Sequence, residues 1–396
     1  MIVPLIDTDL FTWMRDIRRT LHRFPELAYK EVETSALIAA ELDKLGISFQ
    51  QGLAGGTGIR AEIDGGNGQG PCVALRADMD GLPITEETGL PFSSIRPGVM
   101  HACGHDGHVA MLLGAAALLK NMDLTGKIVL LFQPGEESGN GAAAMLEDHA
   151  LAGVDMIFSA HIDTHYPVGR ITVDEGLICS YTDPFTIAIH GSGGHAARPH
   201  EAVDSVVVAA NLVMNMQTLV SRRINPTHAA VVTVGRLEAG TVHNVIAEHA
   251  LLEGTVRSAD RETRERILSG LERVIRGIAD MCNAEIQLKF FDGLPAVVND
   301  PWATVLARNA ALTVVGEEGV ISQGAPSLGG EDFSFYQQLI PGCMVRFGGL
   351  KKKDAAGPAH SARFDFDEEL FKHGTNWLVQ VARQSLEALN PLKGVD

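Results

Sequence analysis

The sequence lacks a regular cysteine framework. Its five cysteines, in 396 residues, stand far apart at positions 72, 103, 179, 282 and 343. A small secreted scaffold held by disulfides would carry an even number of cysteines at close spacings. The odd, scattered set instead indicates a reducing compartment. We therefore predict a cytoplasmic protein in which a thiol such as Cys103 can bind a metal as the thiolate.

A long hydrophobic run is also missing. The longest strongly apolar segment, residues 109–119, is closed by Lys120 and is too short to span a bilayer. The N-terminus has no basic region followed by a long apolar stretch, so we expect no secretory signal. These two absences predict a protein with no membrane partner.

Basic residues are in short supply. The chain has 32 Lys and Arg against 49 Asp and Glu, a formal net charge of −17 at pH 7. A surplus of negative charge repels nucleic-acid backbones and anionic membrane surfaces. We therefore expect no nucleic-acid partner.

The chain does contain enough apolar sequence, 45% of its residues, for a large core. In its first half, helical spacing alternates with short apolar runs. We predict helices over residues 10–21, 31–45 and 106–119, and strands over residues 58–63, 72–77, 127–132 and 155–159. Such alternation is typical of an α/β domain with a mostly parallel central sheet.

The pattern changes near Asp183. It predicts strands over 185–190, 230–234, 249–256 and 284–290, with helices over 203–220 and 262–281, which make a compact α+β unit of ferredoxin-like type. The first pattern then resumes, with a helix over 302–312, a strand over 343–347 and a helix over 367–389. We therefore predict one domain in two parts, residues 1–181 and 295–396, and an inserted domain, residues 182–294.

A dense group of possible metal donors lies at residues 100–108, Met-His-Ala-Cys-Gly-His-Asp-Gly-His. Cys103 and His105 stand at the start of a predicted helix, where both can turn toward one point. The helix N-terminus and a bound cation would each lower the pKa of the Cys103 thiol. A buried thiol beside a capping histidine is the structural alternative, and His101 and His108 are taken as supporting or helix-surface residues.

Two adjacent glutamates, Glu136 and Glu137, follow the predicted strand 127–132. Adjacent carboxylates in a turn point in different directions, so one can bind a metal while the other receives a proton from water. Metal-assisted hydrolysis requires this division of roles. The alternative is two solvated acids at a helix N-terminus, which the helix dipole alone would favour.

Two more histidines are placed to join this group. His161 follows the predicted strand 155–159, and His360 follows a loop that contains Gly and Pro. A lone histidine at a strand end is more often structural. In open α/β sheets, however, sites form beyond the carboxyl ends of the strands, where Asp78 and Asp80 also fall. A thiolate, imidazoles and a carboxylate together suit a borderline-soft divalent ion.

These residues stand in segments that resemble the amidohydrolases of peptidase family M20, subfamily D. That group includes hippurate hydrolases, N-acyl-amino-acid amidohydrolases and indole-acetyl-amino-acid hydrolases. The resemblance runs nearly from end to end and is carried by seven ordered segments: residues 21–27, 75–83, 100–108, 133–137, 194–200, 330–333 and 360–364.

The resemblance implies a metallopeptidase-type catalytic domain with two divalent ions, for which Mn, Zn, Ni and Co stay open. It implies a general base, Glu136, and a residue that orients the site, Asp80. Other branches of the family have a metal-binding histidine where this chain has Asp78, so we give Asp78 a supporting role. The implied metal ligands are Cys103, His105, Glu137, His161 and His360.

For the inserted domain, the resemblance implies a lid that also dimerises, so we expect a homodimer or a higher homo-oligomer. His195 matches a histidine that reaches the partner's active site and stabilises the tetrahedral oxyanion. Asn244 and Arg257 match positions that hold the substrate's amide oxygen or its carboxylate. Ala247 and Ala362 stand where relatives usually have Pro, which leaves loop rigidity and substrate preference open.

The implied reaction is hydrolysis of an N-acyl amino acid, with an acetyl, benzoyl or aryl-acetyl group, to a carboxylic acid and a free amino acid. A dipeptidase or carboxypeptidase would use the same centre with a different acyl pocket. A Cys103 nucleophile with His105 as base is a further alternative, against which the clustered carboxylates argue. A non-catalytic metal-binding relative is the last, and the presence of every expected ligand argues against it.

Overall fold

The computed structural model of the chain describes residues 6–65, 70–351 and 356–390. Residues 1–5, on which the expected absence of a secretory signal partly rests, lie outside this range. Contacts between Cα atoms divide the chain into two compact units. The first comprises Met1–Ile178, Val298–Ala325 and Asp332–Asp396, and the second comprises Cys179–Val297 and Pro326–Glu331.

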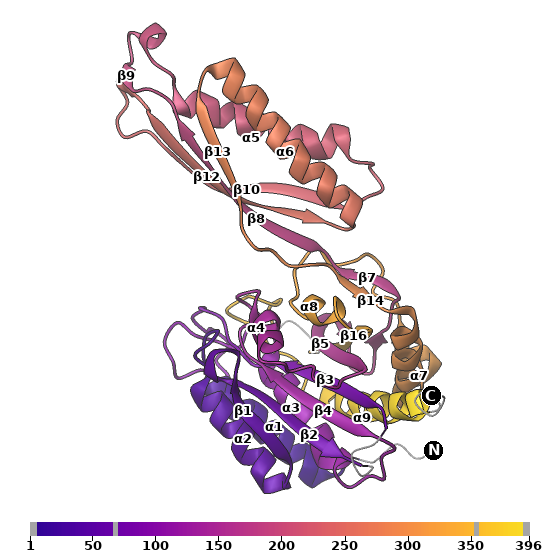
Figure 1. Cartoon of the computed structure of the whole chain (residues 1–396). Coiled ribbons are helices and arrows are strands. Elements are labelled where there is room, and N and C mark those ends of the chain that lie inside the picture. Colours follow the sequence, from indigo (N-terminus) through magenta and orange to yellow (C-terminus); the bar gives the residue numbers. More distant parts are fainter. Residues whose placement is uncertain (1–5, 66–69, 352–355, 391–396) are drawn as a thin grey trace. The chain divides into compact units, whose positions relative to one another are not determined.

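A mixed sheet forms the centre of the first unit (Figure 1). Its four middle strands are parallel, because β3 pairs with β4 and β5, and β5 pairs with β16 in that sense. These strands are nearly continuous apolar runs, as expected for a parallel sheet covered on both faces. In spatial order the strands are β1 (Ser48–Leu53), β2 (Gly58–Asp64), β4 (Lys127–Gln133), β3 (Cys72–Asp78), β5 (Met156–Pro167), β16 (Gly342–Leu350), β6 (Ile171–Thr172) and β15 (Val320–Ile321).

Helices pack around this sheet, and α3 and α9 both contact β3. Helix α3 is buried on every side, which explains why the run 109–119 is apolar throughout although it crosses no membrane. An aspartate caps α1, since Asp7 accepts the backbone N–H of Leu10 at 2.8 Å. The helices of this unit are α1 (Thr8–Arg23), α2 (Val32–Leu45), α3 (His105–Leu119), α4 (Gly141–Glu147), α7 (Pro301–Gly319), α8 (Ser334–Gln337) and α9 (Leu370–Leu389).

The second unit is an antiparallel sheet with two helices on one face. Its strand order is β10 (Ala230–Ala239), β12 (His249–Ser258), β8 (Tyr181–His190) and β13 (Glu285–Phe290). Helices α5 (Ser205–Arg223) and α6 (Arg261–Cys282) pack on the buried side of this sheet. A short ladder joins β9 (Gly194–His195) to β11 (Val245–Ile246). At the points where the chain passes between the units, β7 (Gly176–Cys179) pairs with β14 (Val297–Asn299).

Several predicted elements differ from the observed ones. The predicted strand 155–159 continues to Pro167, so His161 lies inside β5 and does not follow it. Pairing with β16 extends the strand, since Arg346 lies opposite His161 and Leu350 lies opposite Pro167. His360 does not follow a strand end directly either, because β16 ends at Leu350. The prediction missed β1, β6 and β15, which are short or polar.

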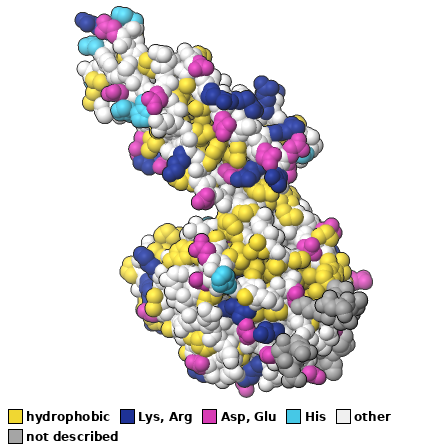
Figure 2. All heavy atoms as spheres, in the orientation of Figure 1, with side chains coloured by type: hydrophobic (Ala, Val, Ile, Leu, Met, Phe, Trp, Pro, Cys, Tyr) yellow, Lys and Arg dark blue, Asp and Glu magenta, His cyan; other side chains and the backbone are white. Residues whose placement is uncertain are grey.

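The described helices include none that is both long enough and apolar enough to cross a bilayer. Figure 2 shows acidic and basic side chains interspersed over much of the visible face of each unit. The net charge of −17 is therefore not gathered there into one acidic patch.

Candidate metal centre

Neighbouring parallel strands of the first unit end at one edge of its sheet. β3 ends at Asp78 and the adjacent β4 ends at Gln133. The turns that follow these strands carry Asp80, Glu136 and Glu137. The carboxyl ends of parallel strands meet at the same edge, so the structure brings these carboxylates together.

His105, the first residue of α3, is fully buried among them. Its Nδ1 lies 3.0 Å from the backbone carbonyl of Asp80 and 3.2 Å from Oδ1 of the same residue. Both partners are acceptors, so Nδ1 carries the proton and Nε2 offers a lone pair. That Nε2 lies 3.8–4.0 Å from carboxylate oxygens of Asp78, Glu136 and Glu137.

Asp80 also positions the turn that carries the paired glutamates. One carboxylate oxygen accepts the backbone N–H of Glu136 at 3.2 Å, and the other accepts that of Glu137 at 3.0 Å. Asp80 is itself buried, so these bonds are not exchanged with solvent. The predicted orienting role of Asp80 corresponds to these contacts with His105, Glu136 and Glu137.

His161 presents its side chain to Cys103. Its Nδ1 donates to the carbonyl of Ile162 at 2.7 Å, which leaves Nε2 as the lone-pair nitrogen. Nε2 lies 3.4 Å from the Cys103 sulfur. A histidine whose second nitrogen donates to a backbone carbonyl is typical of metal sites.

His360 approaches from a loop that precedes α9. Its backbone N–H donates to the carbonyl of Ala102 at 2.8 Å, and its φ of 64° lies in the left-handed region. The side chain is half-exposed, and its Nε2 lies 3.3 Å from Glu137 Oε1. Backbone strain of this kind clusters at functional sites.

The donor set fits a divalent metal. Cys103, His105 and His161 form one group whose donor atoms lie within 4.8 Å of one another, and Cys103, Glu137 and His360 form a second. The buried His105 Nε2 has no hydrogen-bond partner among the described residues. An unsatisfied buried polar atom costs about 1–3 kcal/mol, a cost that a cation at this point would remove.

Charges around the donors set their protonation states. Burial would lower the pKa of His105, but Asp78 and Asp80 outweigh burial and hold that pKa well above its ordinary value. The lone pair of Nε2 would therefore become available when a bound cation displaces the proton from that nitrogen. Burial and the neighbouring His108 hold the pKa of His161 well below its ordinary value. His161 is therefore a neutral imidazole, the form that binds a metal.

The Cys103 thiol is buried in the protein. Burial raises the pKa of Cys103 to about 12, which favours the neutral thiol. A bound cation would favour the thiolate instead.

His108 and Asp78 form a hydrogen bond with each other next to the donor atoms. Asp78 Oδ1 lies 2.5 Å from His108 Nδ1, and Asp78 Oδ2 accepts from Arg76 at 2.6 Å. The Nε2 of His108 accepts the backbone N–H of Ile162 at 2.9 Å, so both of its nitrogens are engaged. His101 and His108 are both buried, which excludes the helix-surface alternative and leaves a supporting role as the prediction for them.

The sequence interpretation missed a buried polar cluster beside the site. Arg76, within the buried strand β3, donates to Gln133 at 2.9 Å and to Asp332 at 2.8 Å. The amide of Gln133 in turn donates to both oxygens of Asp332. An arginine inside an apolar strand run was the signal that could have found this cluster, because such a charge requires a buried partner.

The second unit holds the other predicted site residues. His195 on β9 lies opposite Val245 on β11, and Ala196 donates to the backbone carbonyl of Asn244 at 3.2 Å. The two predicted residues are therefore neighbours. His195 Nδ1 accepts the backbone N–H of Ala197 at 3.1 Å, so a neutral His195 carries its proton on Nε2.

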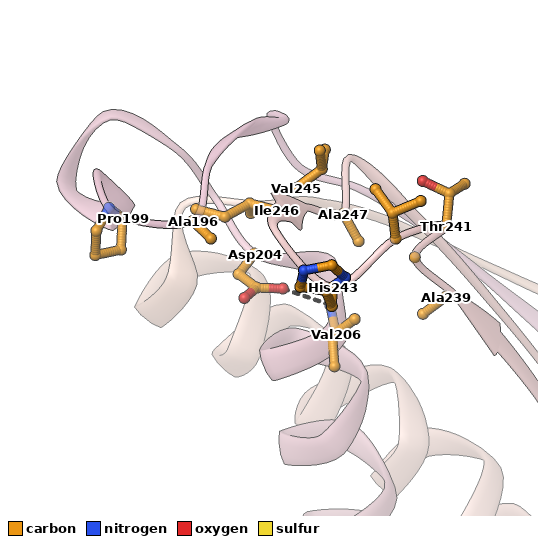
Figure 3. A pocket seen from close by; sticks show the side chains of 12 residues that line it. Ala196, Pro199, Asp204, Val206, Ala239, Thr241, His243, Val245, Ile246 and Ala247 are labelled. Atoms are coloured by element: carbon orange, nitrogen blue, oxygen red, sulfur yellow. Dashed lines mark hydrogen bonds between the residues drawn. The ribbon is translucent and has the colours of Figure 1, made fainter.

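A cavity of about 530 Å³ opens in the same region of the second unit (Figure 3). Asp204 and His243 both line it, and Asp204 Oδ1 accepts the backbone N–H of Val206 at 2.9 Å. The other lining residues are mostly small or apolar, and none of the predicted metal ligands is among them.

Arg257 lies on β12, half-buried. Burial lowers its pKa, and Asp183 offsets part of that effect. Asp183 is held by Arg264 through contacts of 2.6–3.0 Å. In the part of the chain that the structure describes, Arg257 has no ion-pair partner, so its guanidinium can receive an anion.

The chain matches a family profile described as Peptidase family M20/M25/M40 over residues 74–384. It is 40% identical to the N-acetyl-L-cysteine deacetylase of Bacillus subtilis strain 168 over 94% of this chain and 88% of that protein. It is 39% identical to the IAA-amino acid hydrolase ILR1-like 5 of Arabidopsis thaliana over 96% of this chain and 88% of that protein.

A solved structure from Bacillus subtilis is also similar. It is described as a dinuclear metal-binding peptidase of the M20 family and is 36% identical to this chain. The TM-score is 0.84, with 96% of this chain and 99% of that chain covered. The similarity therefore extends over both units and not only over the donor cluster.

Proposed function

The chain belongs to peptidase family M20/M25/M40, and from that premise we propose that it hydrolyses the amide bond of N-acyl amino acids. The products are a carboxylic acid and a free amino acid. The protein is a metal-binding hydrolase of amides. One observation carries the proposal: Glu136 and Glu137 both face the lone-pair nitrogen of His105, next to a thiol and two further imidazoles.

We assign the metal ligands as Cys103, His105, Glu137, His161 and His360. Membership of Cys103 in both donor groups supports a site for two ions, which these residues would hold. Bound divalent ions would lower the pKa of the attacking water and polarise the scissile carbonyl. Imidazole, carboxylate and thiolate donors leave manganese, zinc, nickel and cobalt open.

Glu136 is assigned as the general base. Its backbone is held by Asp80, and its carboxylate oxygen lies 4.0 Å from His105 Nε2, close to the ligands without being needed as one. It takes a proton from the attacking water and passes it to the leaving amine. In this mechanism water is the nucleophile, so Cys103 acts as a metal ligand and does not attack the substrate.

His195 is assigned to the oxyanion of the tetrahedral intermediate. The Nε2–H that its bond to Ala197 leaves available is the donor such an oxyanion requires. We propose that it acts on the active site of the partner in a homodimer. Asn244, beside it, would hold the amide oxygen, and the unpaired guanidinium of Arg257 would hold the substrate carboxylate.

We extend the proposal to the domains. Residues 1–181 and 295–396 form the catalytic domain, and residues 182–294 form a lid that also dimerises. The scattered cysteines support a location in the cytoplasm. A small N-acyl amino acid is the expected partner, and nucleic acid and membrane are not.

A substrate panel tests the proposal. Purified protein is loaded separately with Mn, Zn, Ni or Co and assayed on acetyl, benzoyl and indole-acetyl amino acids, with dipeptides alongside. We expect kcat/KM for the best N-acyl amino acid to exceed that for any dipeptide by about tenfold or more, since the acyl pocket decides.

Two results would contradict the proposal. Turnover of dipeptides without turnover of N-acyl amino acids would show that the protein acts as a peptidase. Activity that survives exhaustive removal of metal would replace the water mechanism with a Cys103 nucleophile.

A further inference from the structure

Glu31 is a buried carboxylate that no part of the proposed reaction uses. It lies between α1 and α2 and is 0% exposed. Glu31 stands at the N-cap position of α2, but its side chain makes no cap bond to that helix. Burying a carboxylate is costly, so its actual partners show what it stabilises.

Those partners lie far away in the sequence. One oxygen of Glu31 accepts the backbone N–H of Gly135 at 3.0 Å. The other accepts the hydroxyl of Thr57 at 3.0 Å. Gly135 is the residue directly before Glu136 and Glu137, so Glu31 contacts the backbone of the turn that carries the proposed base and a proposed ligand.

Three consecutive backbone amides of this turn are held by two carboxylates. Glu31 accepts the N–H of Gly135, and Asp80 accepts those of Glu136 and Glu137. Burial, with a smaller contribution from the nearby Asp80, raises the pKa of Glu31 to about 7. The turn is thus held from two sides by groups that stand on different elements.

The turn also packs closely against Tyr29, two residues before Glu31. Gly135 has a φ of 68°, and a Cβ there would lie 2.9 Å from the ring of Tyr29. The Tyr29 hydroxyl donates to Asn140 Oδ1 at 2.7 Å, on the far side of the same turn. The segment from Tyr29 to Glu31 therefore packs against the turn and forms hydrogen bonds with it.

We propose that Glu31 is a positioning residue that fixes the Gly135–Glu136–Glu137 turn so that both glutamate side chains face the metal donors. The inference rests on the proposed function for the roles of Glu136 and Glu137. Loss of the hydrogen bond between Gly135 and Glu31 should therefore lower turnover and metal affinity. Loss of the hydrogen bond between Thr57 and Glu31 should not.

Glu31→Leu tests the inference, because it keeps similar bulk and removes the acceptor. We expect kcat to fall about 10- to 100-fold with KM changed less than about twofold, and metal affinity to weaken by about tenfold or more, since Glu137 sits on the turn. Thr57→Val is the matched control: it removes the second bond of the same carboxylate and should leave kcat and metal affinity at the wild-type values.

Glu31→Gln should rescue the function. Its amide oxygen can still accept from Gly135 while its NH₂ donates to the Thr57 hydroxyl, so we expect kcat within about fivefold of wild type. Wild-type kcat and metal affinity in Glu31→Leu would overturn the inference. Equal losses in Thr57→Val would also overturn it, because they would reflect general loosening of the core.

If Glu31→Leu does not fold, Glu31→Asp tests the positioning role of Glu31 in its place. It keeps the charge but withdraws the carboxylate from Gly135, so it should show the same loss of kcat and metal affinity, and wild-type values would overturn the inference. Wild-type protein inactive on every N-acyl amino acid would overturn the proposed function instead. Metal affinity, measured on Glu31→Leu and Thr57→Val, would still decide the role of Glu31.

Discussion

At the scale of single residues, the site separates groups that can bind a metal from groups that orient them. Each imidazole assigned as a ligand from α3 or β5 uses Nδ1 for a carbonyl and leaves Nε2 for the donor cluster. His108 has the opposite arrangement, with both nitrogens engaged by Asp78 and Ile162. Hydrogen bonding of the second nitrogen therefore separates ligand from support where the residue type does not.

Glu136→Gln is the test of the general base. The amide keeps the shape of the side chain but cannot take a proton from water, so we expect kcat to fall about 10²- to 10⁴-fold while bound metal is retained. Steady-state kinetics and metal analysis of the purified variant measure both. Cys103→Ala is the contrasting variant, which should lose metal first. Near-normal turnover by Glu136→Gln would remove Glu136 as the base.

At the scale of elements, α1 links the start of α3 to the loop before it. His22 of α1 lies 2.9 Å from Asp106 in the first turn of α3 and 3.3 Å from Glu86 in the loop. Arg18, one turn earlier, donates to Asp106 at 2.9 Å. These buried charges are paired, as burial requires, and they anchor the end of α3 that carries His105.

The same link gives stability a pH dependence. Burial opposes the charge of Glu86, but hydrogen bonds from His22, Thr88 and Ser94 outweigh it and lower the pKa to about 2. Because the folded-state pKa is depressed, this contribution is present above the unfolded value near 4.5 and is lost as pH falls toward about 2. Burial would lower the pKa of His22, but Asp106 and Glu86 raise it, so its contribution is lost as pH rises through that raised value.

We therefore expect the urea midpoint of the wild type to fall between pH 4.5 and about pH 2, and that of Glu86→Gln to fall less. The variant should also be less stable at neutral pH. Glu87→Gln, which changes the exposed neighbour, is the control and should follow the wild type. If the urea midpoints of the wild type and Glu86→Gln fall equally in this pH range, the hydrogen bonds of Glu86 contribute nothing to its pH dependence.

At the scale of the whole molecule, the role proposed for His195 involves two chains. If His195 acts on the partner's site, Glu136→Gln and His195→Ala should each be inactive alone and regain activity when mixed. Random exchange would give hybrid dimers with one intact site, about a quarter of wild-type activity. Mixing after subunit exchange, followed by an assay and a measurement of mass in solution, tests this. A mixture as inactive as its components would place His195 in its own subunit's site or outside any site.

The sequence alone predicted the class of reaction and most of the architecture. Apolar runs and helical spacing are local signals, so they predicted the parallel strands, the helices and the separate α+β unit. The clustered Cys-x-His and Glu-Glu pairs are also local, because their members are neighbours in the chain. The match to the M20 family confirms the amidohydrolase interpretation that these motifs supported.

Tertiary structure alone decided how these residues work together. The position of His161 inside β5 depends on pairing with β16, and the burial of Arg76 depends on Asp332 far along the chain. The contact of Glu31 with Gly135 likewise joins the start of α2 to the turn after β4. No local pattern encodes such pairs, because a buried carboxylate finds its partners through the fold and not through its neighbours in sequence.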